Sequence, residues 1–316
     1  MRSKRVKKEK VLVIVGPTAV GKTALSIELA KKYQGEIISG DSLQVYRGLD
    51  IGTAKATLEE RQGIPHHLLD VCDLGDTYSV SDFQVAGRQK IQEITTRGKL
   101  PIVVGGTGLY IQALLFDFEL GGKEETASNE TLRKELAEYG DRYGHLQLWE
   151  RLNEQDSAAA AVIHPNNVKR VMRAIEVFEL TGQSIMQQKQ VDFKDLTQAL
   201  YDVKLIALTT ERDRLYQRIN QRVDLMVECG VLEEAKKVYE FGKCQAEQGI
   251  GYKEFYPYFE GEQPLEAASE LVKQQSRRYA KRQLTWFRNR MTASWWDLVQ
   301  DPSSQKSLEE EVEEWL

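Results

Sequence analysis

The sequence predicts an α/β protein, with a P-loop core, a parallel sheet flanked by helices, and a helical insertion domain. Residues 16–23 read GPTAVGKT directly after an apolar run at 11–15, which is the strand–GxxxxGK[ST]–helix pattern of a phosphate-binding loop. Further short apolar runs alternate with helical stretches, as is typical of a parallel sheet. Strand patterns stop between about 118 and 198. We therefore assign 1–117 and 199–316 to the core with its C-terminal helices, and 118–198 to the insertion.

The P-loop is expected to bind phosphate through its backbone. Successive N–H groups of the glycine-rich turn surround phosphate oxygens, and the following amphipathic helix directs its positive end at them. Lys22 would reach the outer phosphate, and the Thr23 hydroxyl would ligate Mg²⁺. The motif leaves open whether the phosphate belongs to a nucleotide. The phosphate-binding residues are Gly16, Pro17, Thr18, Ala19, Val20, Gly21, Lys22 and Thr23.

Three further apolar runs predict strands, at 36–40, 101–104 and 203–208. In parallel sheets, ligands gather at the carboxyl ends of the strands. The P-loop, Asp41 and Thr107 all follow such ends, so we expect them to meet at one cleft.

Helices account for the rest of the chain. In the insertion, Val168, Val171, Ile175 and Phe178 recur at helical spacing and predict an apolar stripe. After the last strand the pattern predicts helices at 212–229, 232–241 and 264–290.

Composition predicts an ordinary cytoplasmic protein. Of its 316 residues 41% are hydrophobic and 29% charged, which suits an ordinary globular protein. Its three cysteines have no CxxC spacing, so neither a zinc site nor a disulfide framework is expected. No apolar run approaches the ~18 residues of a membrane span. One active site per chain would fit a monomer.

The net charge of −5 hides a strongly uneven distribution. The stretch 309–314 contains five glutamates, whereas 277–290 contains six basic residues and no acid. Residues 164–173 contain three basic residues and no acid. Because local fields steer a polyanion better than the total charge, a nucleic-acid partner remains compatible with this chain.

Asp41 is the one carboxylate that follows a predicted buried strand. The other strands end in glycine or threonine, whereas many P-loop enzymes hold their metal with an acid in that place. Near a bound phosphate, Asp41 could bind the metal or take a proton from an attacking nucleophile. The alternative is a helix-capping or turn aspartate.

Three other polar positions carry competing interpretations. Gln44 could pair with an adenine edge or be a simple loop amide. Arg212, after the last strand, could clamp a departing phosphate or form an ion pair on a helix surface. His66 and His67 lack acidic partners in register and are more typical of a packed loop than of a metal site.

The basic stretch 277–290 predicts a helix with one face toward the core and basic side chains on another. Arg278 and Arg282 share a face, where they would suit a phosphate backbone, with Tyr279 and Trp286 available to stack on bases. A solvated helix usually mixes charges of both signs.

Together these motifs resemble one family. GPTAVGKT, GDSLQVYRGLDIGTAK (40–55), PHHLLD (65–70), VVGGTGLYI (103–111), GIGYKE (249–254) and RRYAKRQLTWFRN (277–289) are similar, in this order, to motifs of the tRNA dimethylallyltransferase family, the isopentenyl-diphosphate:tRNA isopentenyltransferases. The chain's length resembles the bacterial form. Residues 120–133 depart from the family pattern.

The resemblance implies a prenyl transfer. The P-loop would hold dimethylallyl diphosphate, and the acceptor would be N6 of the adenosine at position 37 of a tRNA, adjacent to the anticodon. Asp41 would be the general base on a flipped-out base. Lys22, Mg²⁺ on Thr23 and Arg212 would neutralise the leaving diphosphate, and Thr18 matches a position at the reacting centre.

The resemblance also implies a tRNA-binding surface for the anticodon stem-loop. Thr107 matches a family position that contacts tRNA, and the insertion matches the region that grips the stem-loop. The expected contacts are Asp41, Ser42, Leu43, Gln44, Thr107, Arg133, Pro165, Asn166, Asn167, Val168, Lys169, Arg278 and Arg282.

Two other functions compete with this reading. A small-molecule P-loop enzyme, such as a nucleotide kinase or an adenylate isopentenyltransferase, would share the P-loop but would not need the basic helices. An RNA-binding P-loop protein without catalysis would not need Asp41 in the cleft.

Overall fold

The computed structural model describes residues 8–118, 127–187 and 191–316, and the side chains of 127–130 are not described. Part of the divergent segment 120–133 therefore lies outside the described residues. The chain divides into two compact units, one formed by residues 1–116 with 192–316 and the other by 117–191. Residues 192–198, expected in the insertion, belong to the first unit.

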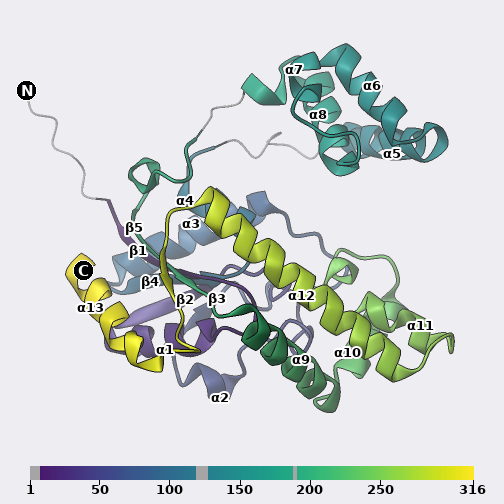
Figure 1. Cartoon of the computed structure of the whole chain (residues 1–316). Helices are drawn as coiled ribbons and strands as arrows, with labels where there is room; N and C mark the ends of the chain where they lie inside the picture. Colours follow the sequence, from purple (N-terminus) through teal and green to yellow (C-terminus); the bar gives the residue numbers. More distant parts are fainter. Residues whose placement is uncertain (1–7, 119–126, 188–190) are drawn as a thin grey trace, which may run out of the picture. The chain divides into compact units, whose positions relative to one another are not determined.

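The first unit is built on a six-stranded sheet in which every pairing is parallel, with the order β3-β2-β4-β1-β5-β6 (Figure 1). All five residues from Val11 to Val15 have no exposed surface, as expected for a strand covered on both faces. The strands are β1 (Lys10–Val15), β2 (Gly35–Ser39), β3 (His66–His67), β4 (Leu100–Gly105), β5 (Asp202–Leu208) and β6 (Ser294–Trp296).

Four of these strands are the ones that the sequence predicted, whereas β3 and β6 are additional. Both are edge strands of only two or three residues, too short to show a periodic pattern. His66 and His67 pair with Ile37 and Ile38 of β2 rather than forming a loop.

Helices cover both faces of the sheet. On one face, α1 (Lys22–Lys32) and α13 (Gln305–Trp315) pack with β-strand residues such as Leu12 and Ile206 in one buried cluster. On the other, α3 (Val80–Thr96) packs against β4 and against α4 (Gly108–Leu115).

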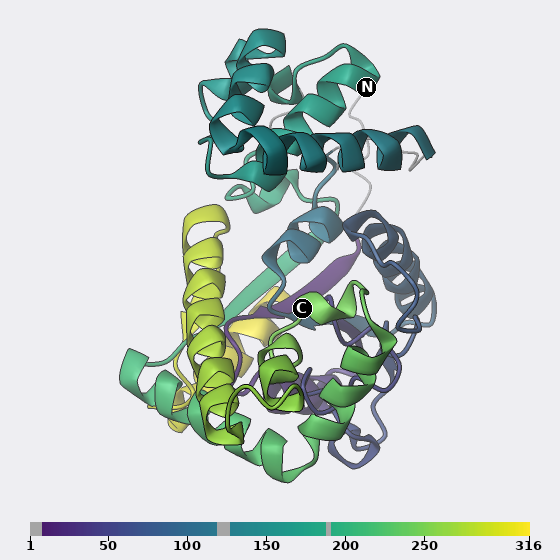
Figure 2. The same ribbon diagram turned by 90° about the vertical axis from the view of Figure 1, so that its right-hand side faces the viewer.

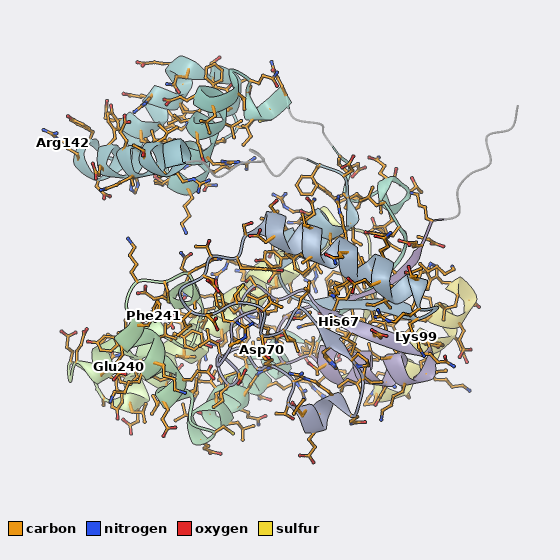
Figure 3. All side chains as sticks on the ribbon, turned by 180° about the vertical axis from the view of Figure 1, so that it is seen from behind. His67, Asp70, Lys99, Arg142, Glu240 and Phe241 are labelled. Atoms are coloured by element: carbon orange, nitrogen blue, oxygen red, sulfur yellow. The ribbon has the colours of Figure 1, made fainter. Side chains whose placement is uncertain are left out.

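The remaining helices of the first unit follow β2 and β5. Helix α12 packs along α9, and its side chains Val272, Ala280 and Phe287 are buried. The helices are α2 (Leu58–Arg61), α9 (Arg212–Glu228), α10 (Val231–Phe241), α11 (Tyr256–Phe259) and α12 (Leu265–Arg290). Figure 3 shows His67 and Asp70 within this unit and Glu240 and Phe241 at its edge.

The second unit is a small helical bundle with its own core (Figure 2). Val171 and Ile175 of the expected apolar stripe are fully buried against Leu148 and Leu152. The Trp149 indole donates a hydrogen bond to the Ile163 carbonyl, 2.7 Å away. Its helices are α5 (Ala127–Tyr143), α6 (His145–Gln155), α7 (Ser157–Ala160) and α8 (Val168–Thr181).

None of the helices in the described part of the chain is long and apolar enough to cross a bilayer.

Candidate active site

The sheet order brings three loops together, because β4 lies between β1 and β2. The Gly40 N–H donates to the Val104 carbonyl at 2.8 Å, so the segment after β2 lies beside the end of β4. Helix α12 contacts the same edge, where Gln283 Nε2 donates to the Gly106 carbonyl at 3.1 Å. A Cβ on Gly106 would lie 2.0 Å from that amide nitrogen, so a larger residue here would displace the Gln283 amide.

The P-loop has the geometry of an anion site. Helix α1 begins at Lys22, and its N-cap Gly21 adopts φ 93°, a left-handed conformation that glycine accepts without strain. Among the described residues no side chain caps this helix end, so its first N–H groups and positive dipole face outward. Ala19 also has a positive φ, of 66°. Phosphate oxygens are the natural partners of such a loop.

Positive charge is concentrated around the P-loop. Burial and the nearby Arg222 guanidinium lower the pKa of Lys22 to about 7, although the Asp41 charge opposes this shift. Lys22 Nζ donates to the Pro17 carbonyl at 2.6 Å. Arg218 Nε donates to the Ala19 carbonyl at 2.7 Å. A bound anion would relieve the repulsion between Lys22 and Arg222.

Arg218 and Arg222 were not singled out from the sequence. They lie one turn apart on α9, and burial lowers the pKa of Arg222 while the Asp41 charge raises it. The signal was a pair of arginines at i and i+4 beside the buried stripe Leu215 and Ile219.

Arg212, the arginine expected to clamp phosphate, lies at the N-terminus of α9 with its guanidinium 5.2 Å from the Tyr216 ring centre. It lines a surface pocket together with Lys281 and Arg288, and no P-loop residue lines that pocket. Its role as a clamp stays a prediction.

Asp41 is half-buried and oriented by the chain that follows it. Its Oδ1 accepts a hydrogen bond from the Leu43 N–H at 2.9 Å, whereas Oδ2 accepts none from the protein within the described residues. The Asp41 charge influences Lys22, Arg222 and Tyr279, so these groups are its electrostatic neighbours. The carboxylate is thus held in a turn, as the alternative interpretation expected, yet keeps one oxygen open.

Polar side chains cluster on the α12 side of the site. Within the described residues Trp286 Nε1 has no hydrogen-bond partner, whereas the side chains of Thr107 and Gln283 interact with the Tyr279 hydroxyl. Burial and the Asp41 charge raise the pKa of Tyr279 to about 12, so its hydroxyl keeps its proton at neutral pH. Groups of this kind are ready to bond a polar ligand.

Gln44 has a different environment from the one expected of a base-reading amide. Its Oε1 accepts from Ser39 Oγ at 2.8 Å, and its Nε2 donates to the carbonyls of Thr53 and Ala54 at 3.2 and 3.4 Å. Both ends of the amide are therefore engaged within the loop. Ser42 and Leu43, beside it, are half-buried.

The insertion positions its expected RNA contacts around the start of α8. Asn166, Asn167, Lys169 and Arg170 are exposed there, next to the positive end of the helix. Pro165 and Val168 are half-buried. Arg133, also expected to contact RNA, forms an ion pair at 2.9 Å with Glu176, a residue that is 2% exposed.

On α12, Arg278 and Arg282 are exposed, and the Arg282 guanidinium lies 5.6 Å from the Tyr279 ring centre. No group of three or more histidine, cysteine or acidic side chains in the described ranges could hold a metal ion.

Family models match nearly the whole chain, IPP transferase over residues 44–290 and Isopentenyl transferase over residues 9–78. The chain is 61% identical to the tRNA dimethylallyltransferase of Enterococcus faecalis, covering 98% of each chain. It is 51% identical to that of Anoxybacillus flavithermus, covering 96% of this chain and 94% of the relative.

Solved structures of similar proteins have the same fold. The full-length tRNA isopentenylpyrophosphate transferase of Bacillus halodurans superposes with a TM-score of 0.69 at 48% identity over 98% of both chains. A eukaryotic dimethylallyltransferase acting on tRNA gives a TM-score of 0.78 at 32% identity, over 95% of this chain and 77% of that one. The motifs, the fold and these likenesses agree, and the chain belongs to the IPP transferase family.

Proposed function

We propose that the protein transfers the dimethylallyl group of dimethylallyl diphosphate to N6 of the adenosine at position 37 of tRNAs and releases diphosphate. The observation that carries this proposal is Asp41, whose Oδ1 is held by the Leu43 N–H while Oδ2 is open, beside the cationic P-loop. The relatives named tRNA dimethylallyltransferase support the same reaction.

The P-loop side suits a diphosphate that leaves. An allylic diphosphate ionises readily when the charge of its leaving group is neutralised. Lys22, Arg218, Arg222 and the N-terminal N–H groups of α1 supply positive charge there. Mg²⁺ would be held by the Thr23 hydroxyl together with phosphate oxygens and water, and would add to this neutralisation. Arg212 is proposed as a further contact to the departing phosphate.

The Asp41 side suits a weak nucleophile. The lone pair of the adenine amine is delocalised into the ring, so the amine benefits from losing a proton during attack. The open Oδ2 of Asp41 can accept that proton, and Thr18 in the P-loop would lie at the reacting centre. The proton moves to Asp41 as the new carbon–nitrogen bond forms and the bond to the diphosphate oxygen breaks.

The acceptor base is reached by flipping it out of the anticodon loop, at a cost of a few kcal/mol. Ser42, Leu43, Gln44 and Thr107 are proposed to receive it. The exposed basic residues of α12 and of the α8 start are proposed to hold the RNA backbone.

Asp41→Ala tests the assignment of the base. The protein is incubated with dimethylallyl diphosphate, Mg²⁺ and an unmodified UNN-decoding tRNA, and prenylated adenosine is quantified. Turnover should fall by about 10²–10⁴-fold, the usual worth of a general base, while tRNA affinity stays within about twofold. The exposed Asp73→Asn serves as control, because among the described residues the Asp73 carboxylate pairs with Arg47 at the surface. An equal loss of tRNA binding would make Asp41 structural.

The same assay with AMP in place of tRNA tests the acceptor. Product on AMP but not on tRNA would contradict the proposal and favour an adenylate isopentenyltransferase. Product on neither would favour RNA binding without catalysis.

A further inference from the structure

The segment that follows Asp41 is tied down by a buried carboxylate from a distant part of the chain. Glu234 on α10 is 6% exposed and accepts three backbone hydrogen bonds from the segment. Its Oε2 accepts from the N–H groups of Asp50 and Ile51 at 2.7 and 2.9 Å. Its Oε1 accepts from the Gly52 N–H at 2.9 Å.

Tyr252, in the GIGYKE motif, completes this arrangement. Its hydroxyl, on a fully buried side chain, donates to Glu234 Oε1 at 2.8 Å. Burial and the Glu234 charge hold the pKa of Tyr252 well above its usual value, so the hydroxyl remains a donor. A Cβ on Gly52 would lie 2.8 Å from this hydroxyl, which explains the glycine in the segment. All four hydrogen bonds to Glu234 are therefore made by fixed donors.

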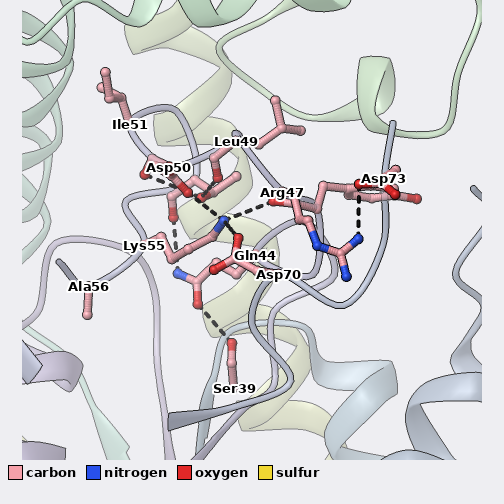
Figure 4. Close-up of polar contacts among 12 residues, drawn as sticks. Ser39, Gln44, Arg47, Leu49, Asp50, Ile51, Lys55, Ala56, Asp70 and Asp73 are labelled. Carbon is pink, nitrogen blue, oxygen red and sulfur yellow. Dashed lines mark hydrogen bonds and ion pairs between the residues drawn. The ribbon is translucent and has the colours of Figure 1, made fainter. Parts of the chain in front are cut away.

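The anchored segment is in turn bonded to Gln44, which contacts Ser39 (Figure 4). The carbonyls of Thr53 and Ala54, directly after the anchored residues, accept from the Gln44 amide. Gln44 lies three residues beyond Asp41, and its other end is held by Ser39 at the end of β2. Both ends of the Gln44 amide are thus fixed, three residues from Asp41.

Lys55 closes the segment on itself. Its Nζ is buried and bonds Asp50 Oδ1 and Asp70 Oδ1, both at 2.6 Å, and the Tyr46 carbonyl at 2.9 Å. These bonds use the three protons of the ammonium group, so the segment folds as one unit around Lys55.

The GIGYKE motif also contacts the residue that orients Asp41. A Cβ on Gly249 would lie 2.5 Å from Leu43 Cδ1, so the backbone of the motif packs directly on the Leu43 side chain. The Leu43 N–H is the donor to Asp41 Oδ1. The motif therefore reaches Asp41 by two routes, through Leu43 and through Tyr252 with Glu234.

We propose that Glu234, supported by Tyr252, is a positioning residue that fixes the segment 41–54 so that the Asp41 carboxylate faces the incoming adenosine. This inference rests on the proposed role of Asp41. Without the carboxylate, three partly buried backbone donors lose their acceptor, and the segment would shift toward water. A misplacement of about 1 Å in a catalytic group can cost about 10²-fold in rate.

Glu234→Gln tests the proposal with little change in shape. An amide offers two donors in place of one oxygen, so at least one backbone N–H would face another donor. Amide hydrogen exchange at 49–54 should accelerate about tenfold, which corresponds to the net worth of about one hydrogen bond. The kcat with tRNA should fall about tenfold or more, while the KM for dimethylallyl diphosphate and the Kd of pyrophosphate stay within about twofold.

Two matched variants separate positioning from general stability. Glu36→Gln removes another buried carboxylate of the first unit, which pairs with Arg97 and His67. It should lower the melting temperature comparably yet leave kcat unchanged. Glu233→Gln changes the exposed neighbour on the same helix and should leave the melting temperature, the amide exchange at 49–54 and kcat unchanged. Tyr252→Phe leaves the three backbone hydrogen bonds in place. Its exchange rate at 49–54 and its kcat should lie between those of wild type and Glu234→Gln.

Unchanged exchange at 49–54 in Glu234→Gln would overturn the anchor. Faster exchange with a kcat equal to that of Glu36→Gln would overturn the positioning role. Failure of the proposed function has a separate signature, namely no prenylated adenosine on tRNA with the wild-type protein, whereas full turnover by Asp41→Ala would remove the role of Asp41 on which this inference rests.

Discussion

Lys22 is a basic side chain in surroundings that disfavour its charged form. Burial and Arg222 lower its pKa to about 7, so without a ligand much of its population is neutral near pH 7. A bound diphosphate adds negative charge beside it and restores the ordinary preference for the proton. Loading of the P-loop is therefore linked to protonation.

At pH 8 we expect pyrophosphate binding to be accompanied by net uptake of about one proton, beyond the contribution of the ligand itself. Calorimetry in two buffers of different ionisation enthalpy measures this uptake. Lys22→Arg is the control, because a guanidinium stays charged in both states and should abolish the uptake. Equal uptake by both proteins would assign the proton to another group.

The same shift predicts a stability effect. The folded-state pKa of Lys22 lies below the unfolded value of 10.5, so the unfolded chain binds this proton more tightly between pH 7 and about 10. Lys22→Met should therefore raise the free energy of unfolding of the ligand-free protein at pH 7, by up to about 4 kcal/mol. The gain should shrink as the pH approaches 10. Urea unfolding at both pH values checks it, and a destabilised variant would contradict it.

At the scale of elements, α12 joins the core to a basic exposed face. Val272, Ala280 and Phe287 are buried, whereas Arg278 and Arg282 face solvent. We expect the double change Arg278→Glu and Arg282→Glu to raise the Kd for tRNA about tenfold or more and to reduce the salt slope by about 1–2. Filter binding at several salt concentrations measures both.

Lys236→Glu, on the exposed side of α10, is the control for a change of net charge alone. If the α12 variant and this control gave the same salt slope, the α12 face would be a solvated surface and no RNA contact.

The pairing of β2 with β3 and α3 depends on Glu36. Burial opposes ionisation, but hydrogen bonds from Arg97 and His67 outweigh it and lower the pKa of the carboxyl. Its stabilising effect is therefore complete above the unfolded pKa of about 4.5 and is lost as the pH falls through the lower folded value. Glu36→Gln should cost about 1–3 kcal/mol at pH 7 and less near pH 3. Denaturant unfolding at both pH values tests this, and an equal cost at both would exclude the linkage.

The sequence predicted those elements whose stabilising pattern lies within one short stretch of chain. The long apolar runs of β1, β2, β4 and β5 and the GxxxxGK[ST] loop are visible in one stretch of chain. Strands β3 and β6 are not, because their few residues pair with strands that lie far away in the sequence. The same limit applies at the site. Arg212 could be singled out from the sequence because it follows a strand end. Arg218 and Arg222 reach the P-loop because of the direction in which α9 packs, and that direction depends on tertiary contacts.

At the scale of the whole molecule, the insertion leaves and re-enters the core at one place. The rings of Phe116 and Phe193, on either side of unit 117–191, lie 5.2 Å apart in edge contact. Close by, the Leu200 N–H donates to the Leu115 carbonyl at 2.8 Å. The core is therefore closed without the insertion.

Replacing residues 117–191 by a short glycine–serine linker should leave a core that unfolds cooperatively and binds pyrophosphate within about threefold of wild type. Its Kd for tRNA should rise about tenfold or more, because the basic start of α8 is removed. Thermal unfolding, calorimetry and filter binding measure these quantities. A core that does not fold, or one that keeps full tRNA affinity, would contradict the expectation.

The meeting of Phe116 and Phe193 has a consequence for how such a protein can diversify. An insertion whose two ends lie in contact can change in length or sequence without moving the strands that carry the P-loop and Asp41. Mutational drift in the helical unit is thereby insulated from the P-loop and Asp41. Related proteins could therefore differ in which RNAs they bind while catalysing the same reaction.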